Sequence, residues 1–430
     1  MKKLSEREGQ QRLLGGGGRR VSVTIEPKIS GNFGSYLGIY TKSHAIPYLQ
    51  GLEPILGVSK PVTNYVNVNS LLSNVSMRVE RFALQEKAKK ILTQTVQRGN
   101  KWAYVHRVNY CLRSRIDKNS DVGLMYNKER NTANYSNLQR CCNVWNCPVC
   151  SAVISEGRRA ELKQGLDNWV SQGDSVYLVT FTNRHYFGDD LADLLAGQKK
   201  AFIKFWQKRA VVEMLKKIGY VGRIVATEVT WGQNGWHPHY HMVFFFDGAV
   251  DMQGLQSFLS LHWQEVCVKS GLPAPTLDRG VDVRDGTYAS QYVSKWGLDC
   301  EMTKGHIKKG REGGLTPFDL LRMSDGLDKY AELFRAFADA FKGKRQLVWS
   351  DGLKERLSIE QKTDEQIISE TEKKSEFVRG LSEQIWYLIL NYNKRAEVLS
   401  LVEQDYIDGG RRLTEFITEL SERFLFDLNT

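Results

Sequence analysis

The chain has 430 residues, and its 60 Lys and Arg against 49 Asp and Glu give a formal net charge of +11. With 41% hydrophobic and 25% charged residues, the composition is that of a globular protein, which excludes wholesale disorder. No apolar run is long enough to cross a membrane, and no apolar stretch follows the basic N-terminal residues as in a secretory signal. We therefore expect a cytoplasmic protein with no membrane partner.

Positive charge is concentrated in the first part of the chain. Residues 1–160 hold 25 Lys and Arg against 10 Asp and Glu, whereas residues 351–430 hold 11 against 17. This imbalance predicts a polyanionic partner, most often nucleic acid. The candidate phosphate contacts near the cysteines are Arg107, Arg113, Arg115, Lys118, Arg158 and Arg159. Three tryptophans either stack on unpaired bases or pack the domain, namely Trp231, Trp236 and Trp296.

The chain order predicts four regions. Residues 1–75 form a basic, partly flexible N-terminal region, and residues 76–160 combine an amphipathic helix with a cysteine-rich module for zinc and DNA binding. Residues 161–305 form a compact α/β unit, which is the candidate catalytic domain. Residues 306–430 are mostly helical, and their acidic end is expected to be a separate helical module.

The central unit alternates strand and helix patterns. A tight turn joins two of its strands, which predicts an α+β fold with an antiparallel sheet and flanking helices rather than a doubly wound parallel sheet. The expected strands are 175–183, 223–231, 239–246 and 280–285. The expected helices are 190–219 with a cap at Asp189 or Asp190, 250–270, 286–296, and one that begins at Thr316-Pro317.

Two histidines in HPHYH (237–241) are the first candidates for chemistry. Alternate side chains of a strand share a face, so His239 and His241 point the same way. A pair of histidines on a strand is often only a surface feature, so a third ligand is needed to argue for a metal.

The turn before these histidines supplies that ligand. If Gly232–Gly235 closes a four-residue turn, Trp231 faces Trp236 and Glu228 lies directly opposite His239. Two imidazoles and one carboxylate then converge with open coordination positions. This arrangement predicts a catalytic rather than a structural metal site.

A pair of tyrosines follows in TYASQYVSKW (287–296). On a helix, Tyr288, Tyr292 and Lys295 share one side because they are spaced by four and three residues. A phenol with its usual pKa of about 10 is a weak nucleophile, and a neighbouring cation or metal makes it more reactive. Attack on a phosphodiester would form a phosphotyrosine and keep the bond energy for rejoining the strand. The alternative is that both tyrosines are core aromatics of an amphipathic helix.

Together these motifs resemble the HUH endonucleases, and specifically the two-tyrosine type of rolling-circle replication initiator (Rep) proteins of plasmids and certain phages. The resemblance rests on LVTFT (178–182), HPHYH (237–241) and YASQYVSK (288–295), in that order, and covers about residues 140–300. It implies an antiparallel-sheet HUH nuclease domain with flanking helices, preceded by a cysteine-rich zinc module and followed by a helical C-terminal module.

The resemblance also implies metal ligands and a nucleophile. His239, His241 and Glu228 would hold a catalytic Mg²⁺ or Mn²⁺ that polarises the scissile phosphate. Tyr292 would be the initiating nucleophile, and Lys295 would stabilise charge on the phosphate or phenolate.

Termination stays open. One plasmid branch of the family has, four residues before the nucleophile, a glutamate that activates water, and here Tyr288 stands in its place. Either Tyr288 or water then acts in the last cleavage. The implied activity is metal-dependent nicking of one strand at an origin that is single-stranded or a hairpin, with a 5′-phosphotyrosine link. A host polymerase would extend the 3′ end, and a host helicase would unwind, because the sequence has no phosphate-binding loop.

Other functions fit parts of this pattern. An HUH-type transposase would use the same chemistry, whereas a relaxase is disfavoured because the tyrosines follow the histidines. From different classes, a two-His-one-carboxylate oxygenase or a non-catalytic zinc-bearing DNA-binding protein remain alternatives, whereas a cupin is disfavoured because no glutamate follows the histidine pair in MVFFF.

A second metal site is predicted in RCCNVWNCPVC (140–150). Cys147 and Cys150 have the spacing of a zinc knuckle, and we take Cys142 as the third ligand. The fourth is Cys111 or Cys141, with Cys111 preferred because adjacent cysteines are sterically awkward. Four thiolates would hold a structural Zn²⁺, and the alternative is a set of ordinary buried thiols.

Overall fold

The computed structural model describes residues 68–93, 95–98, 101–104, 106–286, 314–325 and 328–429. Contacts divide the chain into Met1–Asn64 and Tyr65–Thr430, and every described residue belongs to the second unit. The predicted helix 286–296, which carries Tyr288, Tyr292 and Lys295, lies outside the described residues from residue 287 onwards. The boundaries at 75, 160 and 305 stay predictions.

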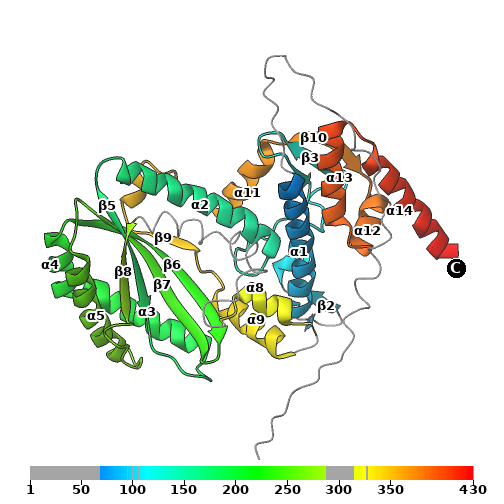
Figure 1. Cartoon of the computed structure of the whole chain (residues 1–430). Helices are drawn as coiled ribbons and strands as arrows, with labels where there is room; N and C mark the ends of the chain where they lie inside the picture. Colours follow the sequence, from blue (N-terminus) through cyan, green and yellow to red (C-terminus); the bar gives the residue numbers. More distant parts are fainter. Residues whose placement is uncertain are drawn as a thin grey trace, which may run out of the picture. The chain divides into compact units, whose positions relative to one another are not determined.

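A five-stranded antiparallel sheet confirms the predicted α+β class (Figure 1), with the strand order β8-β5-β7-β6-β9. Its strands are β5 (Ser175–Thr182), β6 (Tyr220–Gly232), β7 (Gly235–Phe246), β8 (Val281–Asp285) and β9 (Leu347–Trp349). Four of them match predicted strands, and β9 adds a short edge that the sequence pattern did not predict.

The alternation of side chains on β7 gives the sheet two different faces. Tyr240, Met242 and Phe244 are buried against helices α3 (Leu191–Gln207), α4 (Arg209–Lys217) and α5 (Met252–Val268). Val243 and Phe245 face the other way, into a second core with helices α2 (Pro148–Val170) and α10 (Leu353–Arg356). His239 and His241 share the parity of this second face, so the helix α2 side carries the predicted metal site.

The helices differ from the prediction at one point. Asp190 caps α3 as expected, because its side chain accepts hydrogen bonds from the first backbone N–H groups of the helix. The single helix predicted over 190–219 is wrong, since Lys208 takes an extended conformation (ψ 117°) and separates α3 from α4. The capping box at Thr316 begins α8 (Pro317–Met323) as predicted.

The cysteine-rich region and the C-terminal region share one core. A three-stranded sheet has the order β10 (Glu376–Leu381), β3 (Val122–Asn127), β4 (Thr132–Ser136), so two of its strands come from before α2 and one from the C-terminal region. The C-terminal region is mostly helical, as expected, and its one strand in this sheet, β10, pairs with β3 of the cysteine-rich region. Long-range strand pairing decides this arrangement, and helical periodicity does not report it.

The elements that build this shared region are α1 (Val68–Leu92), β1 (Thr95–Arg98), β2 (Lys101–Tyr104), η1 (Arg107–Asn109), β3 (Val122–Asn127), β4 (Thr132–Ser136), α9 (Asp328–Ala340), α11 (Asp364–Lys373), β10 (Glu376–Leu381), α12 (Glu383–Asn391), α13 (Arg395–Asp408) and α14 (Arg412–Asn429). None of the described helices combines the length and apolar composition that crossing a bilayer requires.

Candidate active site

The β6–β7 hairpin has the predicted register. Trp231 pairs with Trp236, and Glu228 pairs with His239 on the neighbouring strand. The turn uses Gln233 and Asn234 between the paired glycines. Since directly opposed residues share a face, the hairpin by itself brings the carboxylate to the imidazoles.

Glu228, His239 and His241 form one compact group of candidate ligands. The Nε2 atoms of His239 and His241 lie 3.1 Å and 2.8 Å from the same carboxylate oxygen, Oε2 of Glu228. Both imidazoles are 12% exposed and the carboxylate is 37% exposed. Solvent therefore reaches the group from the glutamate side.

Two further groups fix the orientation of the imidazoles. Nδ1 of His241 lies 3.0 Å from the Thr180 hydroxyl, and Nδ1 of His239 lies 3.3 Å from the carbonyl oxygen of His237. Such contacts leave both Nε2 atoms directed at Glu228 and select the tautomer of a metal ligand. Our sequence reasoning missed Thr180; the signal is its position in LVTFT, where β5 pairs it with His241.

The electrostatics of the group also suit a cation. Burial opposes ionisation of Glu228, but hydrogen bonds with His239 and His241 outweigh it and hold the pKa of the carboxyl well below its usual value. Burial lowers the pKa of His241, partly offset by Glu228. At His239 burial is outweighed by the hydrogen bond with Glu228, which raises the pKa of this imidazole. The group therefore holds an ionised carboxylate and a His241 imidazole that favours the neutral form, whereas His239 would release its proton when a metal binds.

Comparison with known proteins shows which family the chain belongs to. A model of the replication protein family Rep_1 matches residues 135–397, more than half of the chain and including this whole site. The chain belongs to the Rep_1 replication protein family. This confirms the resemblance to replication initiators, whereas the two-tyrosine subtype stays a prediction.

Two curated relatives come from Streptomyces. The chain is 29% identical over 294 residues to the "Protein rep" of Streptomyces lividans, which covers 52% of this chain and 64% of that protein. It is 33% identical over 141 residues to the "Neomycin resistance protein" of Streptomyces cyanogenus, covering 27% of this chain and 32% of that protein. The chain thus spans less than two thirds of either relative. No solved structure matches it.

A groove borders the candidate ligands of this Rep_1 chain at the end of β5. The His185 and His237 rings stack there at 4.7 Å, and the ring of His237 lies 5.0 Å from that of His239. The lining residues are Thr182, Asn183, Arg184, His185, Tyr186, Phe187, Asn234, His237, Pro275, Thr276 and Arg279. None of them is acidic, so this described groove is suited to an anionic ligand.

Of the two alternatives for the tryptophans, stacking on bases or packing, the structure favours packing for Trp231 and Trp236, and Trp296 lies outside the described residues. Trp236 is 5% exposed within the core, and Trp231 packs edge-on against Tyr330. Both serve packing, whereas Phe187 is 72% and Tyr186 50% exposed at the groove.

The predicted phosphate-binding arginines are mostly engaged in ion pairs. Arg113 pairs with Glu86, and Arg115 pairs with Glu383 at 2.6 Å. Arg158 pairs with Asp364 at 2.6 Å. These three arginines therefore link different segments of the fold, whereas Arg107 and Lys118 are exposed and stay candidate phosphate contacts.

The cysteine cluster contains a different residue from the one predicted. Cys111, Cys141, Cys147 and Cys150 come together, and Cys142 does not. Cys142 has a left-handed backbone conformation (φ 48°), and its sulfur lies 3.9 Å from the carbonyl oxygen of Arg140, outside the group. The prediction of Cys142 as a ligand is therefore wrong, and both open candidates, Cys111 and Cys141, belong to the group.

Proposed function

We propose that this protein is a plasmid or phage rolling-circle replication initiator that nicks one DNA strand by tyrosine attack and later rejoins strands. The observation that carries the proposal is the convergence of Glu228, His239 and His241 in a chain of the replication protein family. Family membership favours this function over an oxygenase that would use the same three ligand types.

The donor set fits a divalent cation. One oxygen of Glu228 and one nitrogen each of His239 and His241 all lie within 4.8 Å of one another. Three protein ligands leave coordination positions for substrate, which is typical of catalytic sites. Two imidazoles suit Mn²⁺ better than Mg²⁺, which prefers oxygen ligands. When bound, the ion would supply Lewis-acid polarisation of the scissile phosphate.

The covalent step is assigned to the tyrosines on the family resemblance. The Tyr292 oxygen attacks phosphorus and loses its proton, the phosphorus–O3′ bond breaks, and the 3′ oxygen leaves as a hydroxyl. A 5′-phosphotyrosine remains, so the strand can be rejoined by the reverse exchange. Lys295 stabilises the developing charge, and Tyr288 or water acts in the final cleavage.

The groove next to the metal ligands is the proposed path of single-stranded DNA. The exposed side chains of Phe187 and Tyr186 offer ring faces for bases, and the Arg184 guanidinium lies 5.5 Å from the Tyr186 ring. Asn183 is 3% exposed, and its amide nitrogen and oxygen lack hydrogen-bond partners among the described residues.

Replication then needs partners that this chain does not supply. The released 3′ hydroxyl would be extended by a host polymerase, and a host helicase would open the duplex, because the sequence has no GxxxxGK[ST] loop. The DNA partner is the origin at its nick site, single-stranded or in a hairpin.

The test is adduct formation with a pool of labelled single-stranded oligonucleotides and Mn²⁺. We expect a denaturant-resistant protein–DNA adduct whose linked peptide contains Tyr292, and a Tyr292→Phe variant that forms none at first cleavage. Tyr288→Phe is the matched control and should still cleave once. Its failure in strand rejoining would assign termination to Tyr288, and success would assign it to water.

Other outcomes identify the alternatives. Binding to DNA without any adduct, unchanged in His239→Ala, would overturn the proposal in favour of a non-catalytic DNA-binding protein. An adduct that transfers DNA into unrelated target sequences would favour a transposase. Metal-dependent oxygen consumption that Tyr292→Phe leaves intact would favour an oxygenase.

A further inference from the structure

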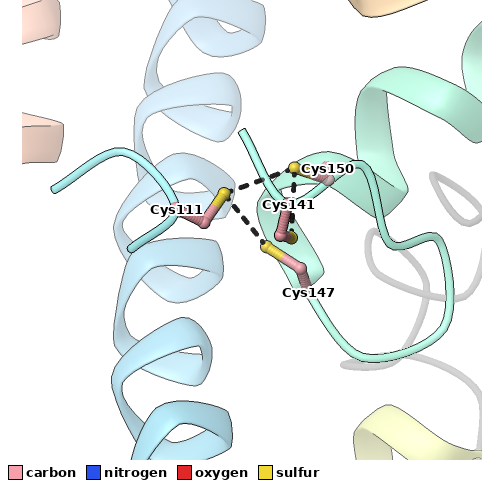
Figure 2. A group of neighbouring side chains, drawn as sticks. All are labelled: Cys111, Cys141, Cys147 and Cys150. Atoms are coloured by element: carbon pink, nitrogen blue, oxygen red, sulfur yellow. Dashed lines mark hydrogen bonds between the residues drawn. The ribbon is translucent and has the colours of Figure 1, made fainter. Parts of the chain in front are cut away.

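The four clustered cysteines lie outside the candidate active site and come from three segments (Figure 2). Cys111 follows η1, Cys141 precedes α2 in a loop, Cys147 caps the N-terminus of α2, and Cys150 lies in its first turn. Side chains that distant in sequence meet only if the fold brings them together.

The sulfur positions match a tetrahedral tetrathiolate site. The Sγ atom of Cys150 lies 3.4 Å from that of Cys111 and 3.6 Å from that of Cys141, and the Sγ atoms of Cys111 and Cys147 are 3.7 Å apart. A tetrahedron with zinc–sulfur bonds of about 2.3 Å has edges of about 3.8 Å. All four cysteines are free thiols, since a disulfide would need sulfurs about 2.05 Å apart.

Burial makes the cluster a closed site. Cys111, Cys147 and Cys150 are 0% exposed and Cys141 is 4% exposed. With four protein ligands and no solvent face, the cluster leaves no position for a substrate, which distinguishes structural from catalytic zinc.

Polar groups surround the sulfurs as a second layer. The amide nitrogen of Gln85 on α1 donates to Cys147 Sγ and to the carbonyl oxygen of Cys111, each at 3.3 Å. The oxygen of the same amide accepts from Arg395 at 2.8 Å, and that guanidinium also donates to the carbonyl oxygen of Leu112 at 3.1 Å. Gln85 and Arg395 are each 1% exposed, and buried polar groups of this kind orient metal ligands.

Charge supports the same conclusion. Four thiolates and one Zn²⁺ carry a net charge of −2, which is costly to bury without nearby cations. Arg395 supplies one from α13, and Arg140 adjoins Cys141 with its side chain only 13% exposed. The glutamates Glu86 and Glu372 pair with these arginines at 2.5 Å and 2.6 Å and hold them in position.

We propose that Cys111, Cys141, Cys147 and Cys150 bind one structural Zn²⁺, and that this ion fixes the joint where α1, the start of α2 and α13 meet. Binding releases four thiol protons to solvent and forms four zinc–sulfur bonds without any redox change. The site is independent of the nicking chemistry, because it shares no residue with the sheet site.

The first test counts metal in the full chain. The variant His239→Ala/His241→Ala removes the imidazoles of the sheet site, so any remaining zinc reports the cysteines. We expect about one zinc per chain by mass spectrometry, and a cobalt-substituted sample with the intense absorption of a tetrahedral tetrathiolate. A zinc-free, folded protein, or a cobalt spectrum of an octahedral site, would overturn the proposal.

The second test uses neighbouring cysteines as a matched pair. Cys141→Ser should reduce zinc from about one to nearly none per chain, whereas Cys142→Ser should keep it. The opposite pattern would overturn this ligand set. If Cys141→Ser does not fold, titration of the His239→Ala/His241→Ala chain with a mercurial reagent still decides. Beyond the thiols that react without releasing zinc, four further thiols should react for each zinc released, and zinc release with fewer would contradict four-sulfur coordination.

Discussion

The two clusters of candidate metal ligands in this protein are built in opposite ways. Glu228, His239 and His241 come from one hairpin, and their carboxylate is 37% exposed. The four cysteines come from three segments and are almost fully buried. Three ligands with an open side suit a reaction, and four ligands in a closed core suit stability. The comparison shows that the solvent exposure of the candidate ligands, and not only their number, distinguishes a catalytic from a structural metal site.

The sharpest test of this comparison is removal of a sheet ligand. We expect His241→Ala to lower the nicking rate about 10³-fold, equivalent to about 4 kcal/mol of transition-state stabilisation, because the divalent ion loses a ligand. Nicking of a labelled origin oligonucleotide measures the loss.

The matched control is His262→Ala, which removes an imidazole from α5 on the other side of the sheet. It should nick at the wild-type rate. Zinc content should not change in either variant, and a parallel loss of zinc and nicking in His241→Ala would merge the two sites that we distinguish.

A substitution beside the buried cysteine cluster should lower the stability of the fold rather than the nicking rate. Arg395→Met removes a guanidinium with 2% exposure together with its bonds to Gln85 and Leu112. We expect about 3 kcal/mol less free energy of unfolding, since buried carbonyl and amide groups lose their partner. Urea denaturation of the full chain measures it.

An exposed ion pair provides the control for that loss. Arg412 pairs with Asp408 at 2.7 Å, with exposed fractions of 45% and 48%. Arg412→Met should cost less than about 1 kcal/mol. Equal losses of unfolding free energy in both variants would contradict the view that the buried contacts of Arg395 stabilise the fold more than an exposed ion pair does.

The groove beside the open site should affect DNA binding more weakly. Phe187→Ala should weaken binding of a single-stranded oligonucleotide by about 1 to 3 kcal/mol, the usual contribution of one stacked base. Phe377→Ala, on β10 of the other sheet, is the matched control because that side chain is also well exposed, at 66% against 72%. Fluorescence anisotropy compares them, and equal affinities would exclude the groove as a DNA path.

Arg184→Ala tests the electrostatic part of the same groove. Loss of one phosphate contact should reduce the slope of binding against salt concentration by about one. An unchanged slope would mean that Arg184 does not contact the backbone of the DNA.

The smallest expected effect is a pH dependence on the cysteine side of the molecule. Burial lowers the pKa of His106, whose Nδ1 accepts a hydrogen bond from the Val108 backbone N–H. Below about pH 6.5 the unfolded chain takes up a proton that the folded chain resists, so stability falls as pH decreases toward the folded pKa. The variant His106→Asn keeps a hydrogen-bond acceptor for the Val108 N–H but has no group that takes up a proton in this pH range.

Urea midpoints at pH 7 and pH 5 compare the two proteins. We expect a smaller drop between these values for His106→Asn than for wild type. An identical drop would assign the acid sensitivity to other groups.

The active-site side of the molecule was largely predictable. Strand periodicity and the glycines of one turn were enough to place Glu228 opposite His239, because a hairpin is a local structure with a fixed register. The Asp190 cap was predictable for the same reason. Thr180 was within reach, but its role depends on the pairing of β5 with β7, which sequence spacing does not specify.

The cysteine side was less predictable. Spacing found Cys147 and Cys150 but selected Cys142, because it does not report that this residue adopts φ 48° and turns its sulfur away. Gln85 and Arg395 gave no sequence signal at all, since each is buried by contacts across more than 200 residues of chain.

By itself, the sequence determined the antiparallel α+β class, the hairpin register and the motif order that relates the chain to replication proteins. These follow from side-chain alternation and turn geometry, which act over a few residues. Only the tertiary structure decided which cysteine joins the closed cluster, that arginines near it serve ion pairs, and that β10 pairs with β3. Those outcomes depend on which distant segments bury one another, and burial is a property of the whole packed chain.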